Sequence, residues 1–171
     1  MIKHFLFWTT TIFLCFILQM ILGYRIAIFG AVPNFQLLAV VFFALRYGSV
    51  PGEYFGFFLG LLADVGSISI FGSQTFVFTL IGYLCGQLRG KIDDEQPFAQ
   101  MGLVLAVGMF YILGLYCLEN MFTGGGQRFK ISMSIIQPIY TALISPLIFW
   151  FLLRWSSWGP RYYRQQNYHF L

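Results

Sequence analysis

The sequence predicts an all-α membrane protein with six transmembrane helices, and three observations support this fold class. Of its 171 residues, 58% are hydrophobic and only 9% are charged, whereas soluble domains carry about 25% charged residues. The apolar residues fall into runs of about 20, the length of a helix that crosses a bilayer. Most of the charged residues lie between these runs or at the ends of the chain. This composition excludes a water-soluble globular protein and a disordered chain, so we expect one integral membrane domain over residues 1–171.

The expected spans are divided by turns that contain proline, glycine or charged residues. They cover about residues 5–22, 26–45, 52–66, 73–89, 98–122 and 132–153. Because proline removes a backbone hydrogen bond, Pro33 predicts an irregular entry to the second span, with the helix proper beginning near Pro33. Residues 52–88 hold only Glu53 and Asp64 as charges. This stretch is too long for one helix, and the small and polar residues at 66–73 predict a break between two short ones.

The positions of the cations predict the orientation. With six spans and both ends in the cytoplasm, the inside holds seven cations: Lys3, Arg46, Arg89, Lys91, Arg154, Arg161 and Arg164. The outside holds three: Arg25, Arg128 and Lys130. The positive-inside rule favours this arrangement over its inverse. Arg46 and Glu53 flank the first cytoplasmic turn; an exposed pair contributes under about 1 kcal/mol, so we expect Arg46 to act mainly as a headgroup anchor.

Two glycine ridges form the strongest local pattern. The first comprises residues four apart on the third helix: Gly52, Gly56, Gly60 and Asp64. The second lies on the fourth helix: Gly82, Gly86 and Gly90. Residues at this spacing share one helix face, and glycine there lets a second backbone approach closely, which is a main source of helix association in lipid. The ridges indicate either internal packing of a helix hairpin or a contact with a partner's membrane helix.

Asp64 is the only acidic residue deep inside an apolar run. It lies twelve residues beyond the predicted helix start at residue 52, which is about 18 Å along a helix and past the middle of a ~30 Å hydrocarbon core. A carboxylate there costs about 2.5–3.5 kcal/mol and needs a partner or water. Three interpretations are open. Asp64 caps the end of its helix or the turn at 67–73, pairs with a cation such as Arg25, or lines a binding cavity or proton path.

The sequence offers little for catalysis or for metal binding. Its two histidines, His4 and His169, lie at opposite ends of the chain, an arrangement that disfavours a metal site. No nucleophile stands beside a plausible base, and no phosphate-binding glycine motif is present. The positive charge does not form the basic stripe of a nucleic-acid-binding surface. We therefore expect a protein that is not an enzyme and uses no metal, cofactor or nucleic acid.

The middle of the chain carries a series of short motifs. Residues 32–35 read Val-Pro-Asn-Phe, and residues 44–48 read Ala-Leu-Arg-Tyr-Gly. Residues 52–64 follow the pattern GxxxGFxxGLLxD, and after Gly72 residues 82–86 read GYLxG. In this order and spacing they resemble the bacterial rod shape-determining protein MreD family. That family commonly has an acidic residue after the proline, where this chain has Asn34, so the resemblance leaves hydrogen bonding but puts an ionic role there in doubt.

The resemblance implies a non-enzymatic subunit of the cell-elongation machinery, spanning the bacterial cytoplasmic (inner) membrane several times. It implies an MreC-like bitopic partner and, through it, the MreB filament, the glycosyltransferase RodA and a class B penicillin-binding protein. The family fold is similar to the substrate-binding subunit of energy-coupling-factor transporters, so a solute-binding transporter subunit is the main alternative, and a small membrane enzyme is a third.

Taken together, the residues and the resemblance predict a scaffold for lateral peptidoglycan synthesis and rod cell shape. Membrane lipid and a second copy of the chain are further expected contacts. The residues expected to fix its shape or to contact the partner are the following: Pro33, Asn34, Arg46, Gly52, Gly56, Gly60, Asp64, Gly82 and Gly86.

Overall fold

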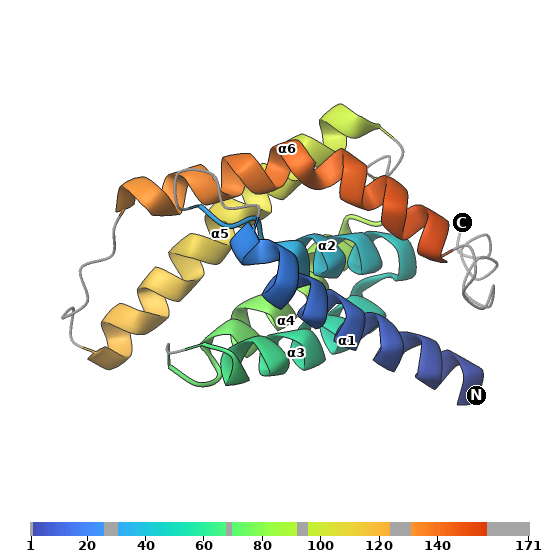
Figure 1. Cartoon of the computed structure of the whole chain (residues 1–171), viewed down its shortest axis with the longest axis horizontal. Coiled ribbons are helices and arrows are strands. Elements are labelled where there is room, and N and C mark those ends of the chain that lie inside the picture. The colour runs from blue at the N-terminus through green and yellow to red at the C-terminus, as the bar shows by residue number, and fades with distance from the viewer. Residues whose placement is uncertain (1, 26–30, 68–69, 92–95, 124–130, 157–171) are drawn as a thin grey trace.

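The computed structural model describes residues 2–25, 31–67, 70–91, 96–123 and 131–156, and these form six helices (Figure 1). In chain order they are α1 (Ile2–Arg25), α2 (Phe35–Tyr47), α3 (Ser49–Val65), α4 (Ser73–Gln87), α5 (Pro97–Thr123) and α6 (Ile131–Ser156). The described residues contain no strand element. The predicted all-α class and the number and order of the helices are therefore confirmed.

Two helix boundaries follow from proline and glycine. α2 begins at Phe35, and Asn34 is its N-cap, as expected from the irregular entry at Pro33. α4 ends at Gln87, so Gly90 lies beyond the helix in a turn, with a φ of 76° that favours glycine. The prediction that Gly90 continues the α4 glycine ridge is wrong because the helix has already ended.

The helices differ in how well they fit a bilayer. Among the described residues, Pro97–Phe122 and Ile136–Ser156 are long and apolar enough to cross a membrane by length and composition. The helices α2, α3 and α4 have 13, 17 and 15 residues, or about 20, 26 and 23 Å, against a ~30 Å hydrocarbon core. Six crossings and the cytoplasmic position of both ends therefore remain predictions. Four of the ten cations whose positions predict the orientation lie outside the described residues: Arg128, Lys130, Arg161 and Arg164.

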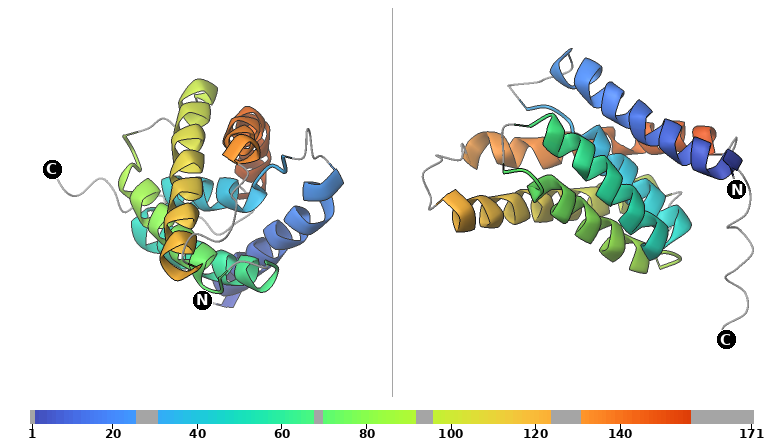
Figure 2. Two further views of the ribbon diagram at one scale, coloured as in Figure 1. Left: turned by 90° about the vertical axis from the view of Figure 1, so that its left-hand side faces the viewer. Right: turned by 90° about the horizontal axis from the view of Figure 1, so that it is seen from below.

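The helices pack around α2. α3 and α4 run antiparallel as a hairpin, α5 packs against both α4 and α6, and α1 crosses α2 and α3 (Figures 1 and 2). The start of α1 and the end of α6 lie at the same end of the molecule, on the right in Figure 1 and in the right panel of Figure 2. This arrangement fits a chain whose two ends share one side.

The central helix α2 carries the core. Residues 36–45 are all buried, and α2 contacts each of the other five helices. Phe43 stacks on Phe55 of α3 with ring centroids 4.4 Å apart, and Phe42 meets Phe149 of α6 at 5.5 Å. A helix that is apolar on all sides is covered either by protein or by lipid, and here the other five helices cover residues 36–45. α2 is therefore an interior helix that other helices separate from lipid.

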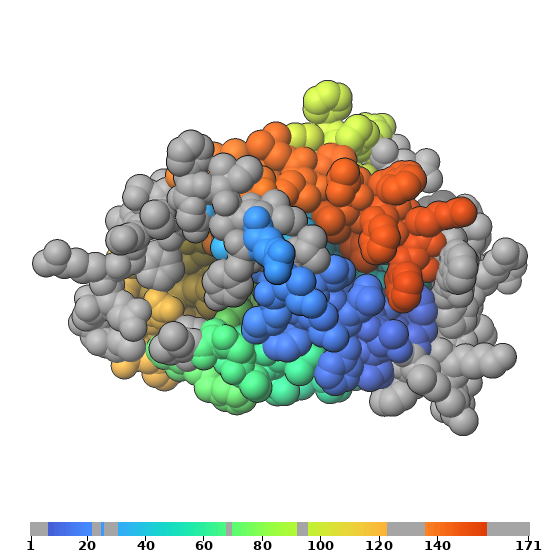
Figure 3. Space-filling model, in the orientation of Figure 1, coloured from blue at the N-terminus to red at the C-terminus, as the bar shows by residue number. Residues whose placement is uncertain are grey.

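Large apolar side chains cover much of the outside of the bundle. Leu113 of α5 is 61% exposed, and Leu147 and Trp150 of α6 are 68% and 70% exposed. Figure 3 shows one face, where α1 fills the space between α3 and α6. Exposed apolar area on this scale is unusual for a monomeric protein in water, and it suits a bundle surrounded by lipid.

Candidate functional site

The α3 glycine ridge lies directly against α4. A Cβ atom at Gly52 would lie 2.7 Å from the carbonyl oxygen of Gly82 and 2.7 Å from the Cβ of Ala44 in α2. A Cβ at Gly60 would lie 2.5 Å from the Cα of Thr75. Real Cβ atoms do not approach other atoms this closely, so only glycine allows the two helices to pack at this distance.

The α4 glycines lie on the other side of this close contact between α3 and α4, which we call the glycine seam. A Cβ at Gly82 would collide with the carbonyl group of Gly52, and a Cβ at Gly86 would collide with the backbone of Ser49. The centre of the seam is Gly56, where a Cβ would collide with the carbonyl group of Phe78. All five ridge glycines are buried. They pack inside the hairpin, and the neighbouring helices leave no room for a partner helix at these positions.

Asp64 ends the α3 ridge and caps the next helix. Its side chain is 2% exposed and accepts hydrogen bonds from the backbone N–H groups of Gln74 at 3.0 Å and Thr75 at 2.9 Å, and from the Thr75 hydroxyl. Those N–H groups belong to the first turn of α4, whose own N-cap residue, Gly72, provides no side-chain cap. A carboxylate at a helix N-terminus satisfies free N–H groups and interacts favourably with the helix dipole.

Of the three interpretations of Asp64, the structure shows capping, by N–H groups of the following helix. The Ser67 hydroxyl donates to the backbone carbonyl of Asp64, not to its carboxylate. Residues 68 and 69 lie outside the described residues. Arg25 is exposed, and the structure shows no ion pair between it and Asp64. Both carboxylate oxygens are occupied by α4, which ties the ends of α3 and α4 together.

Hydrogen bonds extend from this cap to α5. The Tyr111 hydroxyl donates to the side-chain oxygen of Gln74 at 3.3 Å, and the Gln74 amide donates to the carbonyl of Ala63 at 3.4 Å. Gln74 thus connects three helices through its side chain and, through its backbone N–H, binds Asp64. Inside a membrane such polar side chains act as links between helices because lipid offers them no other partners.

A second polar cluster holds the N-terminus of α2. The Gln19 side chain of α1 donates to the Pro33 carbonyl at 3.2 Å and accepts from the Phe35 N–H at 2.8 Å. The Asn34 side chain accepts from the Leu37 N–H at 2.9 Å, which is a helix N-cap. The Asn34 N–H donates to the Thr141 hydroxyl of α6 at 3.2 Å. Asn34 therefore keeps the hydrogen bonding that a carboxylate at this position would also provide.

The two clusters meet at a small cavity. Asn34 and Thr141 line it together with Tyr111, Gly108 and other side chains, and its volume is about 10 Å³. Six polar residues, the N-cap of α2 and one residue from each of the other five helices, thus surround the middle of the bundle: Gln19, Asn34, Asp64, Gln74, Tyr111 and Thr141. Four of these residues were not predicted from the sequence: Gln19, Gln74, Tyr111 and Thr141. In the sequence each is a hydrogen-bonding side chain isolated in an apolar run. This pattern indicates that the side chain needs a partner but does not predict which residue the partner is.

The Asn34 cap provides a direct test of this cluster. We expect Asn34→Ala to lower the free energy of unfolding by about 1 kcal/mol, because the Leu37 N–H loses its acceptor. Asn34→Asp retains an acceptor oxygen, so we expect a change within about 0.5 kcal/mol. Thermal unfolding of the detergent-solubilised protein measures both. Equal destabilisation by alanine and aspartate would show that the side chain acts in another way than as an acceptor.

Arg89 and Gly48 lie at the other end of the hairpin, away from Asp64. The Arg89 guanidinium donates to the Tyr47 carbonyl at 3.0 Å, which places a cation at the C-terminus of α2. Gly48 turns the chain there with a φ of 100°. Arg46 is half-buried at the same end, whereas Glu53 is exposed. Glu53 makes no ion pair with the described residues, Arg46 included, so the pair considered between them is not formed.

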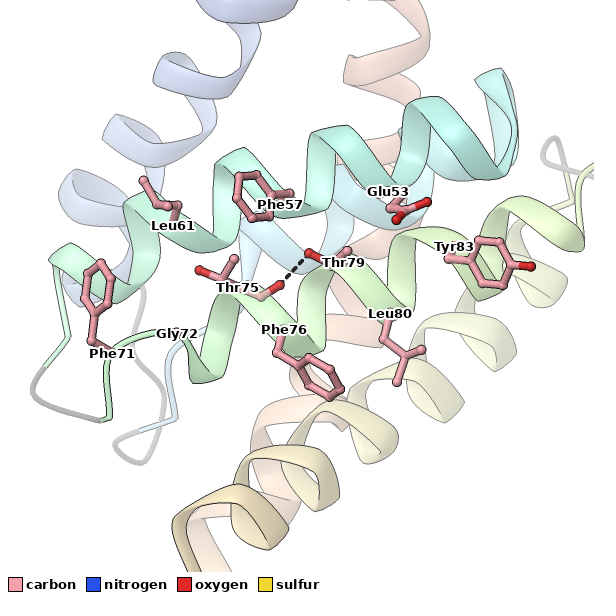
Figure 4. Close-up of a pocket in the computed structure, with 10 residues that line it drawn as sticks. All are labelled: Glu53, Phe57, Leu61, Phe71, Gly72, Thr75, Phe76, Thr79, Leu80 and Tyr83. Carbon is pink, nitrogen blue, oxygen red and sulfur yellow. Dashed lines mark hydrogen bonds between the residues drawn. The ribbon is translucent and has the colours of Figure 1, made fainter. Parts of the chain in front are cut away.

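A groove runs along the outer face of the hairpin (Figure 4). Its volume is about 560 Å³. Side chains of α3 form one wall and side chains of α4 the other. The residues that line it are Glu53, Phe57, Leu61, Phe71, Gly72, Thr75, Phe76, Thr79, Leu80 and Tyr83.

The described residues contain no group of three His, Cys, Asp or Glu side chains that could hold a metal ion.

Comparison with known proteins gives one match. The family model for the rod shape-determining protein MreD matches residues 1–155 of the chain. Searches of curated proteins and of solved structures find no match. MreD is a family of membrane proteins with a structural role in rod shape, and it is not a known enzyme family. The family model covers the helices, the glycine seam and both polar clusters, and the chain therefore belongs to the rod shape-determining protein MreD family.

Proposed function

We propose that the chain is a non-enzymatic scaffold of the bacterial cytoplasmic membrane that binds an MreC-like bitopic protein. Through this partner it supports the MreB filament, RodA and a class B penicillin-binding protein during peptidoglycan synthesis along the side wall. The chain contributes a fixed shape, and its contacts with the partner position the synthetic machinery.

The observation that carries this proposal is the state of Asp64. A chemically active carboxylate in a membrane protein needs access to water, a substrate or another titratable group. Asp64 is 2% exposed and binds the first turn of α4 with both oxygens. The most conspicuous polar residue of the chain therefore stabilises the fold. The other polar side chains of the bundle interior do the same, since they connect neighbouring helices.

The alternative of a solute-binding transporter subunit needs a cavity of suitable size. Sites for small molecules have volumes of about 300–1,000 Å³. The cavity that polar side chains line at the centre of the bundle has about 10 Å³, which is about the space of one water molecule. The groove on the hairpin is large enough, but it is open to the outside, where its wall residues Phe57 and Phe76 are 42% and 59% exposed. The geometry therefore supports a scaffold better than a carrier.

The proposal predicts two results in cells. Cells that lack the chain become round, and expression of the wild-type chain restores rod shape, measured as the ratio of cell length to width. An affinity tag on the chain recovers the MreC-like partner from detergent-solubilised membranes. A photo-crosslinking scan of single cysteines along α1 to α4, in cells that hold the partner, then locates the contact. Turnover of a substrate by the purified chain, or transport by the chain alone in liposomes, would overturn the proposal.

A further inference from the structure

The groove on the hairpin has two parallel walls with helical spacing. Phe57 and Leu61 follow Glu53 at four-residue intervals along α3, one position after each ridge glycine. Phe76 and Leu80 form the facing wall on α4. Phe57 is 42% exposed and Phe76 is 59% exposed. Because the glycines bring α3 and α4 close together, the large side chains beside them stand as two ridges with a channel between them, a shape that accepts a ridge of a third helix.

The floor of the groove consists of small residues whose hydrogen bonds are already made. Thr75 and Thr79 lie between the two walls (Figure 4). The Thr79 hydroxyl donates to the Thr75 carbonyl at 2.6 Å, and the Thr75 hydroxyl donates to Asp64. The floor therefore demands no polar group from an occupant, and small residues there permit the close approach that helix association in lipid requires.

One charge stands at the end of this apolar channel. Glu53 is exposed and has no partner among the described residues. It lies near Tyr83 (Figure 4), at the end of the hairpin where the Arg89 guanidinium donates to the Tyr47 carbonyl. Lys91 follows Arg89 in sequence. The Glu53 carboxylate, at the edge of an apolar surface, attracts a cation of a partner. Arg89 and Lys91 would repel a partner cation that approached this end of the hairpin away from Glu53.

We propose that this groove binds the transmembrane helix of a single-pass partner that carries Lys or Arg at the end of the helix that meets Glu53. This inference rests on the proposed function and assigns its binding surface. Cytoplasmic flanks of membrane helices are rich in Lys and Arg, and the predicted orientation places Glu53 on the cytoplasmic side. From Gly72 to Tyr83 the groove follows α4 for about 17 Å, more than half of a ~30 Å core. The partner's apolar face fills the channel, and its cation pairs with Glu53.

Photo-crosslinking tests where the partner lies. The exposed native cysteine is first removed by Cys117→Ser. Leu80→Cys then provides a thiol in the groove to which a photoreactive crosslinking label is attached. Leu113→Cys places the same label on α5, where the side chain is 61% exposed and is not among the residues that line the groove. With the MreC-like partner co-expressed, we expect a crosslink to the partner from position 80 and at least about fivefold less from position 113.

Charge exchange tests the role of Glu53. We expect Glu53→Lys to lower the crosslink yield from position 80 by about tenfold, because like charges at a contact disfavour binding. Replacement of the partner's flanking Lys or Arg by Glu should restore the yield with Glu53→Lys. The melting temperature of the isolated Glu53→Lys chain should match that of the wild type, since Glu53 is exposed and makes no hydrogen bond or ion pair with the described residues.

The outcomes separate this inference from the proposed function. If the tagged wild-type chain fails to recover the partner, both are overturned. If the partner is recovered but crosslinks only from position 113, or position 80 crosslinks a second copy or no protein, the groove assignment is overturned and the proposed function stands. A Glu53→Lys yield equal to the wild type, or no restoration by the reversed partner charge, overturns the pairing.

Discussion

Replacement of Gly56 by leucine is expected to break the α3–α4 hairpin and to lower the free energy of unfolding by about 3 kcal/mol or more. Oversized side chains in a packed core usually cost about 1–3 kcal/mol because neighbouring side chains move. At Gly56 the added Cβ collides with the carbonyl group of Phe78. Backbone cannot rotate away as a side chain does, so the two helices must separate.

The measurement is thermal unfolding of the detergent-solubilised chain. For a protein of this size, about 3 kcal/mol corresponds to a fall in melting temperature of roughly 6–12 °C. Gly102→Leu is the matched control, since a Cβ at Gly102 of α5 meets no atom within 4 Å. We expect that control to leave the stability unchanged or to raise it by up to about 1 kcal/mol, because glycine inside a helix is destabilising. Equal melting temperatures for Gly56→Leu and the wild type would refute the tight packing of the hairpin.

The α3–α4 hairpin both stabilises the fold and forms the proposed binding groove. The α3 wall of the groove stands one residue away from the glycine ridge, and α4 forms the other wall, so separation of α3 and α4 would widen the channel. Loss of partner recovery with Gly56→Leu would therefore report a damaged fold rather than a lost contact. Substitutions on the groove surface, such as those at Glu53 and Leu80, are the ones that separate binding from folding.

Asp64→Ala is expected to have the second large effect. It removes the acceptor of the Gln74 and Thr75 N–H groups and of the Thr75 hydroxyl. A buried donor without a partner costs about 1–3 kcal/mol, so we expect a loss of about 3 kcal/mol or more in the free energy of unfolding. Asp64→Asn keeps one acceptor oxygen and should fall between alanine and the wild type.

Glu53→Ala is the matched control for Asp64→Ala. Both substitutions remove a carboxylate from α3, but Glu53 is exposed and has no partner among the described residues, so its loss should change the stability by less than about 0.5 kcal/mol. Thermal unfolding of the isolated chain measures all three variants. If Asp64→Asn were as stable as the wild type and recovered the partner but failed to restore rod shape, Asp64 would have a role beyond capping.

Local patterns in the sequence were sufficient to predict the number and order of the helices. The break predicted at residues 66–73 matches the end of α3 at Val65 and the start of α4 at Ser73. The start of α2 after Pro33 was also predicted, since proline and glycine act on their own backbone and its nearest neighbours. The family was recognised for the same reason, because its motifs are short and ordered along the chain. The glycine spacing predicted a close helix contact but left open which helix makes it.

Tertiary structure alone decided which residues meet. Gln19 binds the chain at Pro33, and Asn34 binds Thr141, 107 positions away; neither partner follows from periodicity, because a polar residue in an apolar run can bond to any neighbouring helix. The same holds for the burial of α2, which by sequence is one apolar span among six. The amino-acid sequence by itself determined the helices, their order and the faces with small residues, since these depend on neighbours within a few positions. The placement of the glycines inside the hairpin, the capping of α4 by Asp64 and the exposed groove depended on how distant segments pack, which local chemistry does not encode.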